Sequence, residues 1–332
     1  MANIVVLGAG GWGTALATLA HKNGHTVTMW SPFAEEIAAI RRDGQHRRLL
    51  PDIPVPTSLQ LSTDIACVAA ADLVLLTVPS FAIVQTADAM RPHLRQGAVV
   101  ANAAKGLCPD TGRRLSELLA EHLPTARVAI LSGPSHAEEV ARGVPTMLCV
   151  ASADAGAAAT VQELLSNKRF RLYLTADMVG VELGGALKNA IALAAGICDG
   201  LDLGDNTKAA LMTRGLAEMS RLGVALGAEA TTFSGLSGMG DLIVTCGSMH
   251  SRNRRAGILI GQGLTAAEAV EQVGTVEGYF ACATAVELAR RVGVEIPIIE
   301  QCYRICYEQV PAREALAALL ARPSGGAEKF GC

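Results

Sequence analysis

The chain has 332 residues, of which 50% are hydrophobic and 18% charged, so it is long and apolar enough to build the cores of two domains. A formal net charge of −3 argues against nucleic acid as the main partner. Nine cysteines without a CxxC pair predict a reducing, cytoplasmic location and no metal site. The longest apolar stretch, residues 68–84, contains Asp72 and Pro79 and predicts no membrane span.

Strands and helices are predicted to alternate through the first half of the chain. The predicted strands are Asn3–Gly8, Thr26–Trp30, Leu73–Pro79, Ala98–Ala103, Arg127–Ser132 and Thr146–Val150. The predicted helices between them are Thr14–Lys22, Ala34–Arg42, Phe81–Arg91, Thr111–His122 and Ala137–Arg142. Because the strands are runs of Val, Leu and Ile, we expect a parallel sheet that helices cover on both faces. Residues 1–178 are therefore predicted to form a doubly wound, Rossmann-like α/β domain.

From about residue 178 onward the pattern changes to helices alone. The predicted helices are Val181–Cys198, Thr207–Leu226, Ser251–Gln262, Ala266–Val273, Gly278–Val292 and Ile298–Gln309. The sequence thus predicts a second, all-α domain over residues 179–322 that carries the substrate site. A flexible tail is expected over residues 323–332.

The first motif of the chain is the turn Gly8-x-Gly10-x-x-Gly13, which follows a predicted strand and opens a predicted helix. In a dinucleotide-binding turn, Gly8 makes the tight bend, Gly10 lets the backbone approach a pyrophosphate, and Gly13 lets the helix pack on the strand. The helix start then offers free N–H groups and the positive end of its dipole to the phosphates. This context predicts a dinucleotide cofactor rather than a plain glycine turn.

The end of the second predicted strand leaves the type of cofactor open. NAD-binding domains usually place Asp or Glu there to bind the 2′-hydroxyl of the adenosine ribose. The segment Met29–Pro32 contains no acid, and Glu35 and Glu36 come late. It contains no arginine for a 2′-phosphate either, and Ser31 could serve either cofactor weakly. The expected cofactor is NAD or NADP, with the preference undecided.

Lys188 lies in an apolar predicted helix, and Gly184 and Gly185 precede it on the same face. Two glycines weaken a helix by roughly 1 kcal/mol each, so we expect them to leave a groove beside the lysine that is open to a ligand. Desolvation there disfavours the charged form of the lysine and suits proton exchange with a carbonyl or alcohol oxygen. The alternative is a lysine that extends from a buried helix to the solvent.

Two loops after predicted strands carry further candidates. Lys105 stands at the carboxyl end of a strand, where ligands bind in open α/β sheets; the alternative is a solvent-exposed lysine. Gly133 and Ser135 follow the next strand and open a helix. Ser135 could donate to a ligand, although capping of that helix is the more common role for such a serine. His136 is expected at the surface.

The second half carries two more candidate groups. Ser251–Arg255 begins a predicted helix with three arginines, which oppose the helix dipole unless an anion is bound. A phosphate could bind here, with Arg252 as a bidentate donor and Ser251, Asn253 and backbone N–H groups as further donors. The alternative is a solvated basic face. Asp241 follows a glycine-rich loop and could cap a helix, or accept a hydrogen bond from a substrate hydroxyl or a lysine.

With these motifs in this order, the chain resembles the bacterial-type NAD(P)-dependent glycerol-3-phosphate dehydrogenase family from residue 3 to about residue 322. The segments that carry the resemblance are Gly8–Ala17, Gly133–Glu139, Gly184–Asn189, Thr213–Met219, Gly238–Leu242 and Ser251–Arg255. It implies reversible reduction of dihydroxyacetone phosphate to sn-glycerol 3-phosphate, which feeds glycerophospholipid synthesis. Many relatives carry a basic residue where Pro32 stands, which leaves the use of NADP open.

The resemblance also implies roles for single residues. Lys188 would be the proton donor and acceptor, and Lys105 would be a second catalytic lysine that stabilises the same oxygen. The implied substrate-binding residues are Lys105, Gly133, Ser135, Lys188, Asp241, Ser251, Arg252 and Asn253. The implied cofactor-binding residues are Gly8, Gly10, Gly11, Trp12, Gly13, Lys105, Ala137, Arg252 and Glu277. The substrate is expected to bind between the two domains.

Two other functions stay open at this point. A dehydrogenase of the β-hydroxyacid type also has a helical second domain, but it would take a carboxylate rather than a phosphate. A nicotinamide-sensing binding protein would bind the cofactor without turnover. The apolar helical domain would also suit a homodimer.

Overall fold

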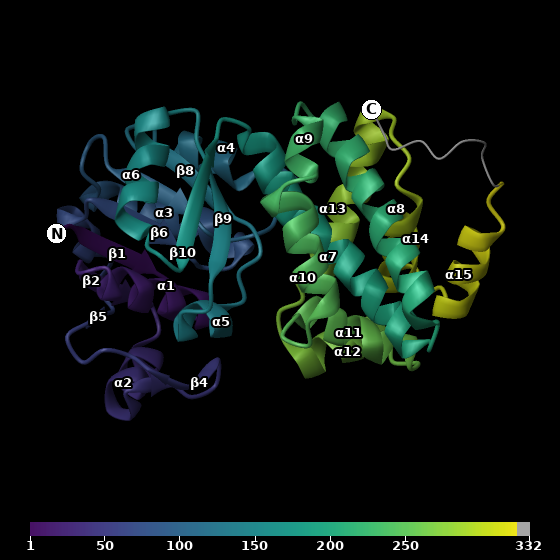
Figure 1. The fold of residues 1–332 in the computed structure, drawn as a ribbon, viewed down its shortest axis with the longest axis horizontal. Helices are drawn as coiled ribbons and strands as arrows, with labels where there is room; N and C mark the ends of the chain where they lie inside the picture. The colour runs from purple at the N-terminus through teal and green to yellow at the C-terminus, as the bar shows by residue number, and fades with distance from the viewer. Residues whose placement is uncertain (324–332) are drawn as a thin grey trace. The chain divides into compact units, whose positions relative to one another are not determined.

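The computed structural model describes residues 1–323 (Figure 1). The chain divides into two compact units. One contains residues 1–105 and 113–178, and the other contains residues 106–112 and those from 179 onward. The short segment 106–112 thus lies with the helical unit, although it falls in the range expected for the first domain. The tail expected over residues 323–332 lies outside the described residues, apart from Pro323.

The first unit is built on an eight-stranded sheet in the order β10-β9-β8-β7-β6-β1-β2-β5. Its strands are β1 (Asn3–Leu7), β2 (Thr26–Trp30), β5 (Gln60–Ser62), β6 (Leu73–Leu76), β7 (Val99–Asn102), β8 (Arg127–Ser132), β9 (Thr146–Ala151) and β10 (Phe170–Thr175). A separate antiparallel pair is formed by β3 (Gln45–His46) and β4 (Leu50–Pro54). All six predicted strands are present, whereas β3, β4, β5 and β10 were not predicted.

The sheet is parallel except between β8 and β9, so the prediction of a wholly parallel sheet is wrong at that pair. The connection between them holds α5 (Ala137–Arg142), a helix of 6 residues. A parallel crossover has to carry the chain back along the whole strand, usually on a longer helix. This short connection instead reverses the chain at the carboxyl end of β8, and β9 runs back beside β8.

Helices cover both faces of the central strands. The other helices of this unit are α1 (Gly11–Lys22), α2 (Ala34–Asp43), α3 (Ile83–Met90), α4 (Leu115–His122) and α6 (Ala155–Leu165). Ile4 and Val6 of β1 belong to a core with buried residues of α1, α5 and α6. Val5 and Leu7 point to the opposite face and belong to a core with α3 and α4. The predicted doubly wound, Rossmann-like fold is therefore confirmed.

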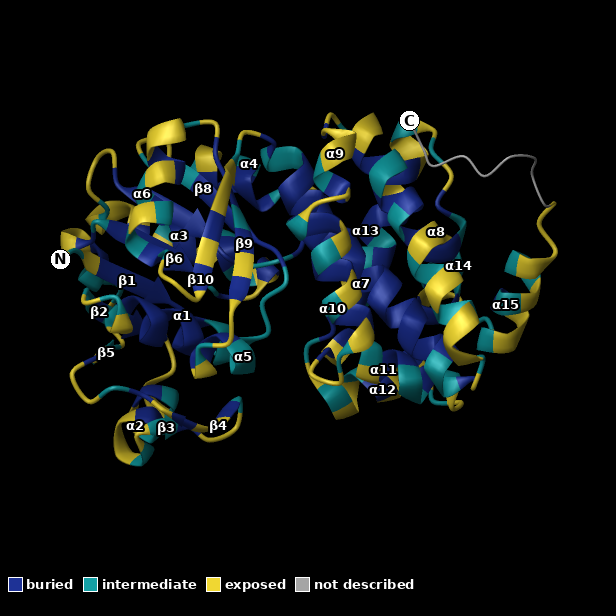
Figure 2. Cartoon of the chain, viewed as in Figure 1, coloured by how far each residue is buried: buried dark blue, intermediate teal, exposed yellow. Residues whose placement is uncertain are grey.

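The second unit is helical, as predicted. Its helices are α7 (Met178–Gly200), α8 (Gly204–Ala225), α9 (Ala230–Phe233), α10 (Asp241–Gly247), α11 (Arg252–Gly261), α12 (Ala266–Val273), α13 (Glu277–Val292), α14 (Pro297–Tyr307) and α15 (Ala312–Leu320). Of these, α9, α10 and α15 were not predicted. α7 is buried along most of its length and supplies much of the core (Figure 2). Among the described helices it alone is long and apolar enough to cross a membrane, but its most apolar window is wholly buried, as in a core helix.

A buried acid ties two helices of this unit together. Glu218 of α8 is 3% exposed, and its carboxylate accepts the backbone N–H groups of Ile298 (2.8 Å) and Ile299 (3.2 Å). These N–H groups belong to the first turn of α14 and have no partner within their own helix. Burial raises the pKa of Glu218 to about 7, against the lowering effect of these two hydrogen bonds and of Arg221 and Arg214.

We expect this acid to make stability depend on pH. An unfolded chain releases the Glu218 proton near pH 4.5 and the folded chain near pH 7, so stability falls as the pH rises between these values. The loss is complete above the folded pKa and is on the order of 3 kcal/mol. Glu218→Gln cannot ionise but keeps an oxygen acceptor. Urea unfolding at about pH 5 and about pH 8 should therefore show a smaller loss for the variant than for the wild type. Equal losses would contradict the assignment.

Candidate functional site

The turn between β1 and α1 has the shape of a phosphate cradle. Gly8 has φ +119°, a conformation that favours glycine, and its N–H donates to the carbonyl oxygen of Trp30 at 2.9 Å. A Cβ at Gly13 would overlap the carbonyl oxygen of Gly8, whereas a Cβ at Gly10 would meet nothing within 4 Å. The backbone at Gly10 is thus open to a ligand directly before the unpaired N–H groups of the first turn of α1. The residues present fit the pyrophosphate of a dinucleotide.

Three other predicted cofactor residues lie around this turn. A Cβ at Gly11 would stand 3.8 Å from the Cβ of Ala137, the first residue of α5. The indole Nε1 of Trp12 donates to the carbonyl oxygen of Ala103 at 3.2 Å, two residues before Lys105. The structure therefore brings the end of β7 and the start of α5 to the first turn of α1.

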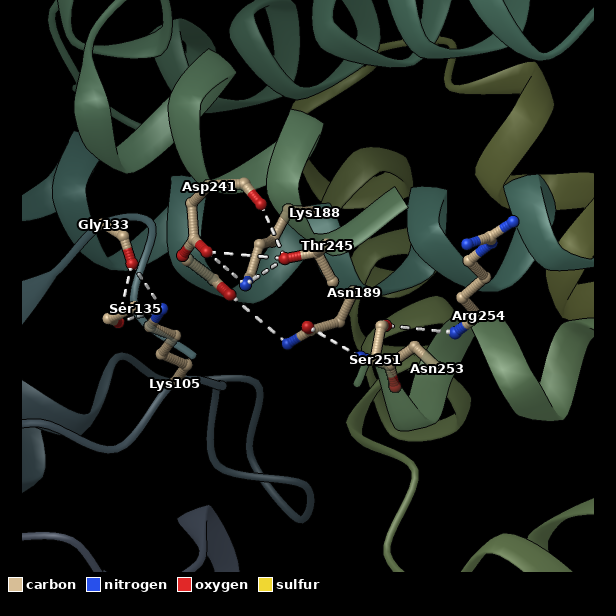
Figure 3. A network of polar contacts seen from close by, with 11 residues as sticks. Lys105, Gly133, Ser135, Lys188, Asn189, Asp241, Thr245, Ser251, Asn253 and Arg254 are labelled. Carbon is tan, nitrogen blue, oxygen red and sulfur yellow. Dashed lines mark hydrogen bonds and ion pairs between the residues drawn. The ribbon is translucent and has the colours of Figure 1, made fainter. Parts of the chain in front are cut away.

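Lys105 links the ends of two neighbouring strands (Figure 3). Its Nζ donates to the carbonyl oxygen of Gly133 at 2.7 Å and to the hydroxyl of Ser135 at 3.3 Å. The Ser135 hydroxyl itself donates to the carbonyl of Gly133 at 2.9 Å. Ser135 does not cap α5, whose N-cap residue is His136, because its hydroxyl points back to Gly133. The capping interpretation of Ser135 is therefore wrong, and Lys105 is partly buried rather than freely solvated.

Lys188 of α7 ends in a buried ion pair (Figure 3). Its side chain is 7% exposed, and Nζ lies 2.5 Å from Oδ1 of Asp241 and 2.7 Å from the hydroxyl of Thr245. The Thr245 hydroxyl donates to the backbone carbonyl of Asp241 at 2.6 Å, so its lone pairs face the ammonium. The alternative of a lysine that reaches solvent is wrong. The expectation that Asp241 accepts from a lysine is met.

Gly184 brings these partners together. A Cβ at this position would lie 2.6 Å from the carbonyl oxygen of Ser237, in the π-helical turn Leu236–Gly240 that leads into α10. The glycine therefore lets this turn approach α7, which places Asp241 within reach of Lys188. The groove that we expected from Gly184 and Gly185 is filled by backbone at Gly184, so the prediction is wrong at that glycine.

The start of α11 is held by its own polar side chains. The Ser251 hydroxyl caps the helix by accepting the N–H of Arg254 at 3.2 Å. The Asn253 side chain donates Nδ2 to Oδ1 of Asn189 at 2.9 Å, and its Oδ1 accepts the N–H of Gly278 at 2.8 Å. Asn189 follows Lys188, as Figure 3 shows. The amide of Asn253 thus fixes α11 against α7 and against the start of α13, where Glu277 lies.

The three arginines of α11 differ in their surroundings. Arg254 donates Nε to Asp199 at 2.7 Å and Nη1 to the carbonyl oxygen of Gly247 at 2.7 Å, so it is a structural ion-pair residue. Arg252 and Arg255 are exposed, and Arg252 occupies the first position of the helix. Arg252 is therefore the arginine best placed to meet an anion at this helix start.

Thr245 and Asn189 were missing from the predicted site. Thr245 stands four residues after Asp241 in α10, a helix that was not predicted, so the shared face of the two residues was not apparent. Asn189 directly follows Lys188, but its bond to Asn253 depends on the packing of α11 against α7. Over residues 1–323, no group of three His, Cys, Asp or Glu side chains is arranged to hold a metal ion.

Comparison with known proteins gives one consistent family. Models of the N- and C-terminal domains of NAD-dependent glycerol-3-phosphate dehydrogenase match residues 3–158 and 177–317. A glycerol-3-phosphate dehydrogenase [NAD(P)+] of Moorella thermoacetica is 51% identical over 97% of this chain and 96% of that protein. One from Fusobacterium nucleatum is 47% identical over 97% of both chains. The crystal structure of glycerol-3-phosphate dehydrogenase from Coxiella burnetii superposes with a TM-score of 0.93, at 39% identity, over 97% of this chain and 99% of that one. The chain belongs to the NAD-dependent glycerol-3-phosphate dehydrogenase family.

Proposed function

We propose that this protein reversibly reduces dihydroxyacetone phosphate to sn-glycerol 3-phosphate with NADH or NADPH. The observation that carries the proposal is the buried Lys188, whose ammonium is held by Asp241 and Thr245 in a chain of this family. The names of the Moorella and Fusobacterium relatives give the same activity and the same open choice of cofactor.

A bound nicotinamide would supply or accept the hydride at the C2 carbon of the substrate. Lys188 would donate a proton to the developing alkoxide during reduction and take it back during oxidation. Asp241 balances the charge of the ammonium, and Thr245 accepts from it in a fixed direction, so the two hold Nζ in one place. Lys105 would stabilise the same oxygen through its positive charge.

The phosphate of the substrate would bind at the start of α11. Arg252 would act as a two-pronged donor to its oxygens. The side chains of Ser251 and Asn253 already hold other groups of this unit. We therefore propose that Asn253 contacts the phosphate through its backbone N–H in the first helical turn. The N–H of Ser251 already donates to the carbonyl oxygen of Ser248 at 3.3 Å, so Ser251 would donate its hydroxyl hydrogen instead. Gly133 and Ser135 would contact the substrate beside Lys105, and Glu277 would contact the cofactor.

Steady-state assays test this function. Oxidation of NADH and of NADPH is followed with dihydroxyacetone phosphate and, separately, with 2-keto and 3-keto acids. Turnover that requires the phosphorylated ketone supports the proposal. Turnover of the carboxylates alone would favour a β-hydroxyacid dehydrogenase, and cofactor binding without any turnover would favour a sensor.

Location, purpose and assembly are further proposals. The eight cysteines of the described residues are free thiols, which supports a reducing cytoplasm. There the product would feed glycerophospholipid synthesis. We also propose a homodimer, which sedimentation equilibrium tests by a mass of twice the 34.4 kDa of one chain.

A further inference from the structure

The end of β2 lies against the glycine turn. The carbonyl oxygen of Trp30, the last residue of β2, accepts the N–H of Gly8 at 2.9 Å, and Ser31 comes next in the chain. In open sheets of this kind the adenosine ribose of a dinucleotide lies at this strand end, beside the turn that binds the pyrophosphate. A charge held at Ser31 would therefore meet the 2′ position of the ribose.

An acid does reach this place, although none stands there in the sequence. Glu36 is in the first turn of α2, and one of its carboxylate oxygens accepts the hydroxyl of Ser31 at 2.6 Å. The other oxygen lies 3.3 Å from Nε2 of His46. The helix turn folds the chain back, so that a residue five positions after Ser31 returns to the end of the strand. Ser31 itself is buried, whereas the Glu36 side chain is 23% exposed.

Glu36 is held in its ionised form. The hydrogen bond with His46 lowers its pKa most, and burial opposes this; the bond from Ser31 and the positive charges of His46 and Arg48 lower it further. At neutral pH Glu36 is therefore a carboxylate, and Ser31 and His46 orient its two oxygens.

We propose that Glu36 is the residue that makes this enzyme prefer NAD over NADP. Its carboxylate, oriented by Ser31, accepts a hydrogen bond from the free 2′-hydroxyl of the adenosine ribose. The same carboxylate repels the 2′-phosphate of NADP, because two like charges would share one small site. This inference rests on the proposed use of a nicotinamide cofactor and names which of the two cofactors the site selects.

The nearby cations are less well placed to reverse this preference. Arg47 is paired with Asp43, with 2.9 Å between Nε and Oδ2. Arg48 is exposed, and its neighbour Leu49 lies over Gly11, 3.5 Å from where a Cβ would stand there. This puts the segment that carries Arg48 over the pyrophosphate turn, from where its charge still reaches Glu36. Glu36, in contrast, is bonded directly to Ser31, the residue that follows β2. A 2′-phosphate bound by Arg48 would appear in the experiment as a preference for the phosphorylated ligand.

The test uses the adenosine half of the cofactor, so that it does not depend on turnover. Dissociation constants of ADP-ribose and 2′-phospho-ADP-ribose are measured by calorimetry for the wild type, for Glu36→Gln and for Glu35→Gln. Glutamine can still accept the Nε2–H of His46 and donate to the hydroxyl of Ser31, so the fold is kept. Glu35 is an exposed acid beside Glu36, and Glu35→Gln changes the net charge of the chain by the same amount as Glu36→Gln.

We expect the wild type to bind ADP-ribose at least about tenfold more tightly than its 2′-phosphorylated form. Glu36→Gln should lower that ratio by about tenfold, while Glu35→Gln should change it by less than about twofold. Three results overturn the proposal: tighter binding of the phosphorylated ligand by the wild type, an unchanged ratio in Glu36→Gln, or no binding of either ligand. The steady-state assay tests the reduction of dihydroxyacetone phosphate separately, so a failure of this proposal can be told apart from a failure of the proposed function.

Discussion

Replacing Lys188 with alanine is expected to lower kcat for dihydroxyacetone phosphate reduction by about 10²- to 10⁴-fold, the usual contribution of a positioned proton donor. The substitution removes the ammonium that Asp241 and Thr245 hold. The glycine turn belongs to the other unit, so the affinity for NADH should change by less than about twofold. Steady-state kinetics and NADH fluorescence titration measure the two effects on the same preparation.

Two controls separate proton transfer from the loss of an ion pair. Lys188→Arg keeps a cation beside Asp241, which is 1% exposed and is destabilising when left unpaired, but a guanidinium does not release its proton at neutral pH. We expect it to fold and to be nearly inactive. Lys208→Ala removes a less buried ion pair of the same unit, 2.8 Å from Asp199, which keeps its pair with Arg254, and should leave kcat within about twofold of the wild type. Turnover near that of the wild type in Lys188→Arg would exclude Lys188 as the donor.

The sequence predicts those parts of the site that local rules govern. The turn Gly8–Gly13 could be identified because its chemistry depends on the backbone and on the order strand, turn, helix. Lys188 could be identified as a candidate because it is a charged residue within an apolar predicted helix and follows two glycines. For Asp241, a hydrogen bond from a lysine was one of three roles left open. The helix α10 that carries it has 7 residues and follows a π-helical turn, so it is too short to show a helical period.

Other features depend on contacts between distant segments. Gly184 was expected to make room for a ligand, but it makes room for the backbone at Ser237. Distance along the chain is also a poor guide at the end of β2. Glu36 comes several residues after the strand, so the sequence does not identify it as an acid at the strand end. The first turn of α2 returns it to Ser31, and this is visible only once the helix start is fixed.

One missed helix did carry a local signal. Asp154 caps α6 and accepts the N–H groups of Gly156 and Ala157, which is the usual role of an acid at a helix start. The run of Ala and Gly that follows it lacks a strong apolar period, so the cap was the better guide than the pattern. β10, which follows α6, is an edge strand with one exposed face and does not have the continuous apolar run of the central strands.

Arg252→Ala is expected to raise KM for dihydroxyacetone phosphate by about 100-fold and to leave kcat within a few-fold. The exposed Arg252 occupies the first position of α11, where a cation opposes the helix dipole unless an anion is bound. Its removal should weaken the binding of the phosphate in the ground state and the transition state alike, which raises KM rather than lowering kcat. Steady-state kinetics over a wide substrate range measures both constants.

The neighbouring arginines supply matched controls for this prediction. Arg255→Ala removes the same charge from the exposed surface of the same helix and should leave KM within about twofold. Arg254→Ala breaks the ion pair with Asp199. It should therefore lower the temperature of unfolding and have little effect on KM. Inorganic phosphate, which competes for the same donors, should inhibit the wild type and Arg255→Ala equally and Arg252→Ala much less. An unchanged KM in Arg252→Ala would remove this residue as the phosphate anchor.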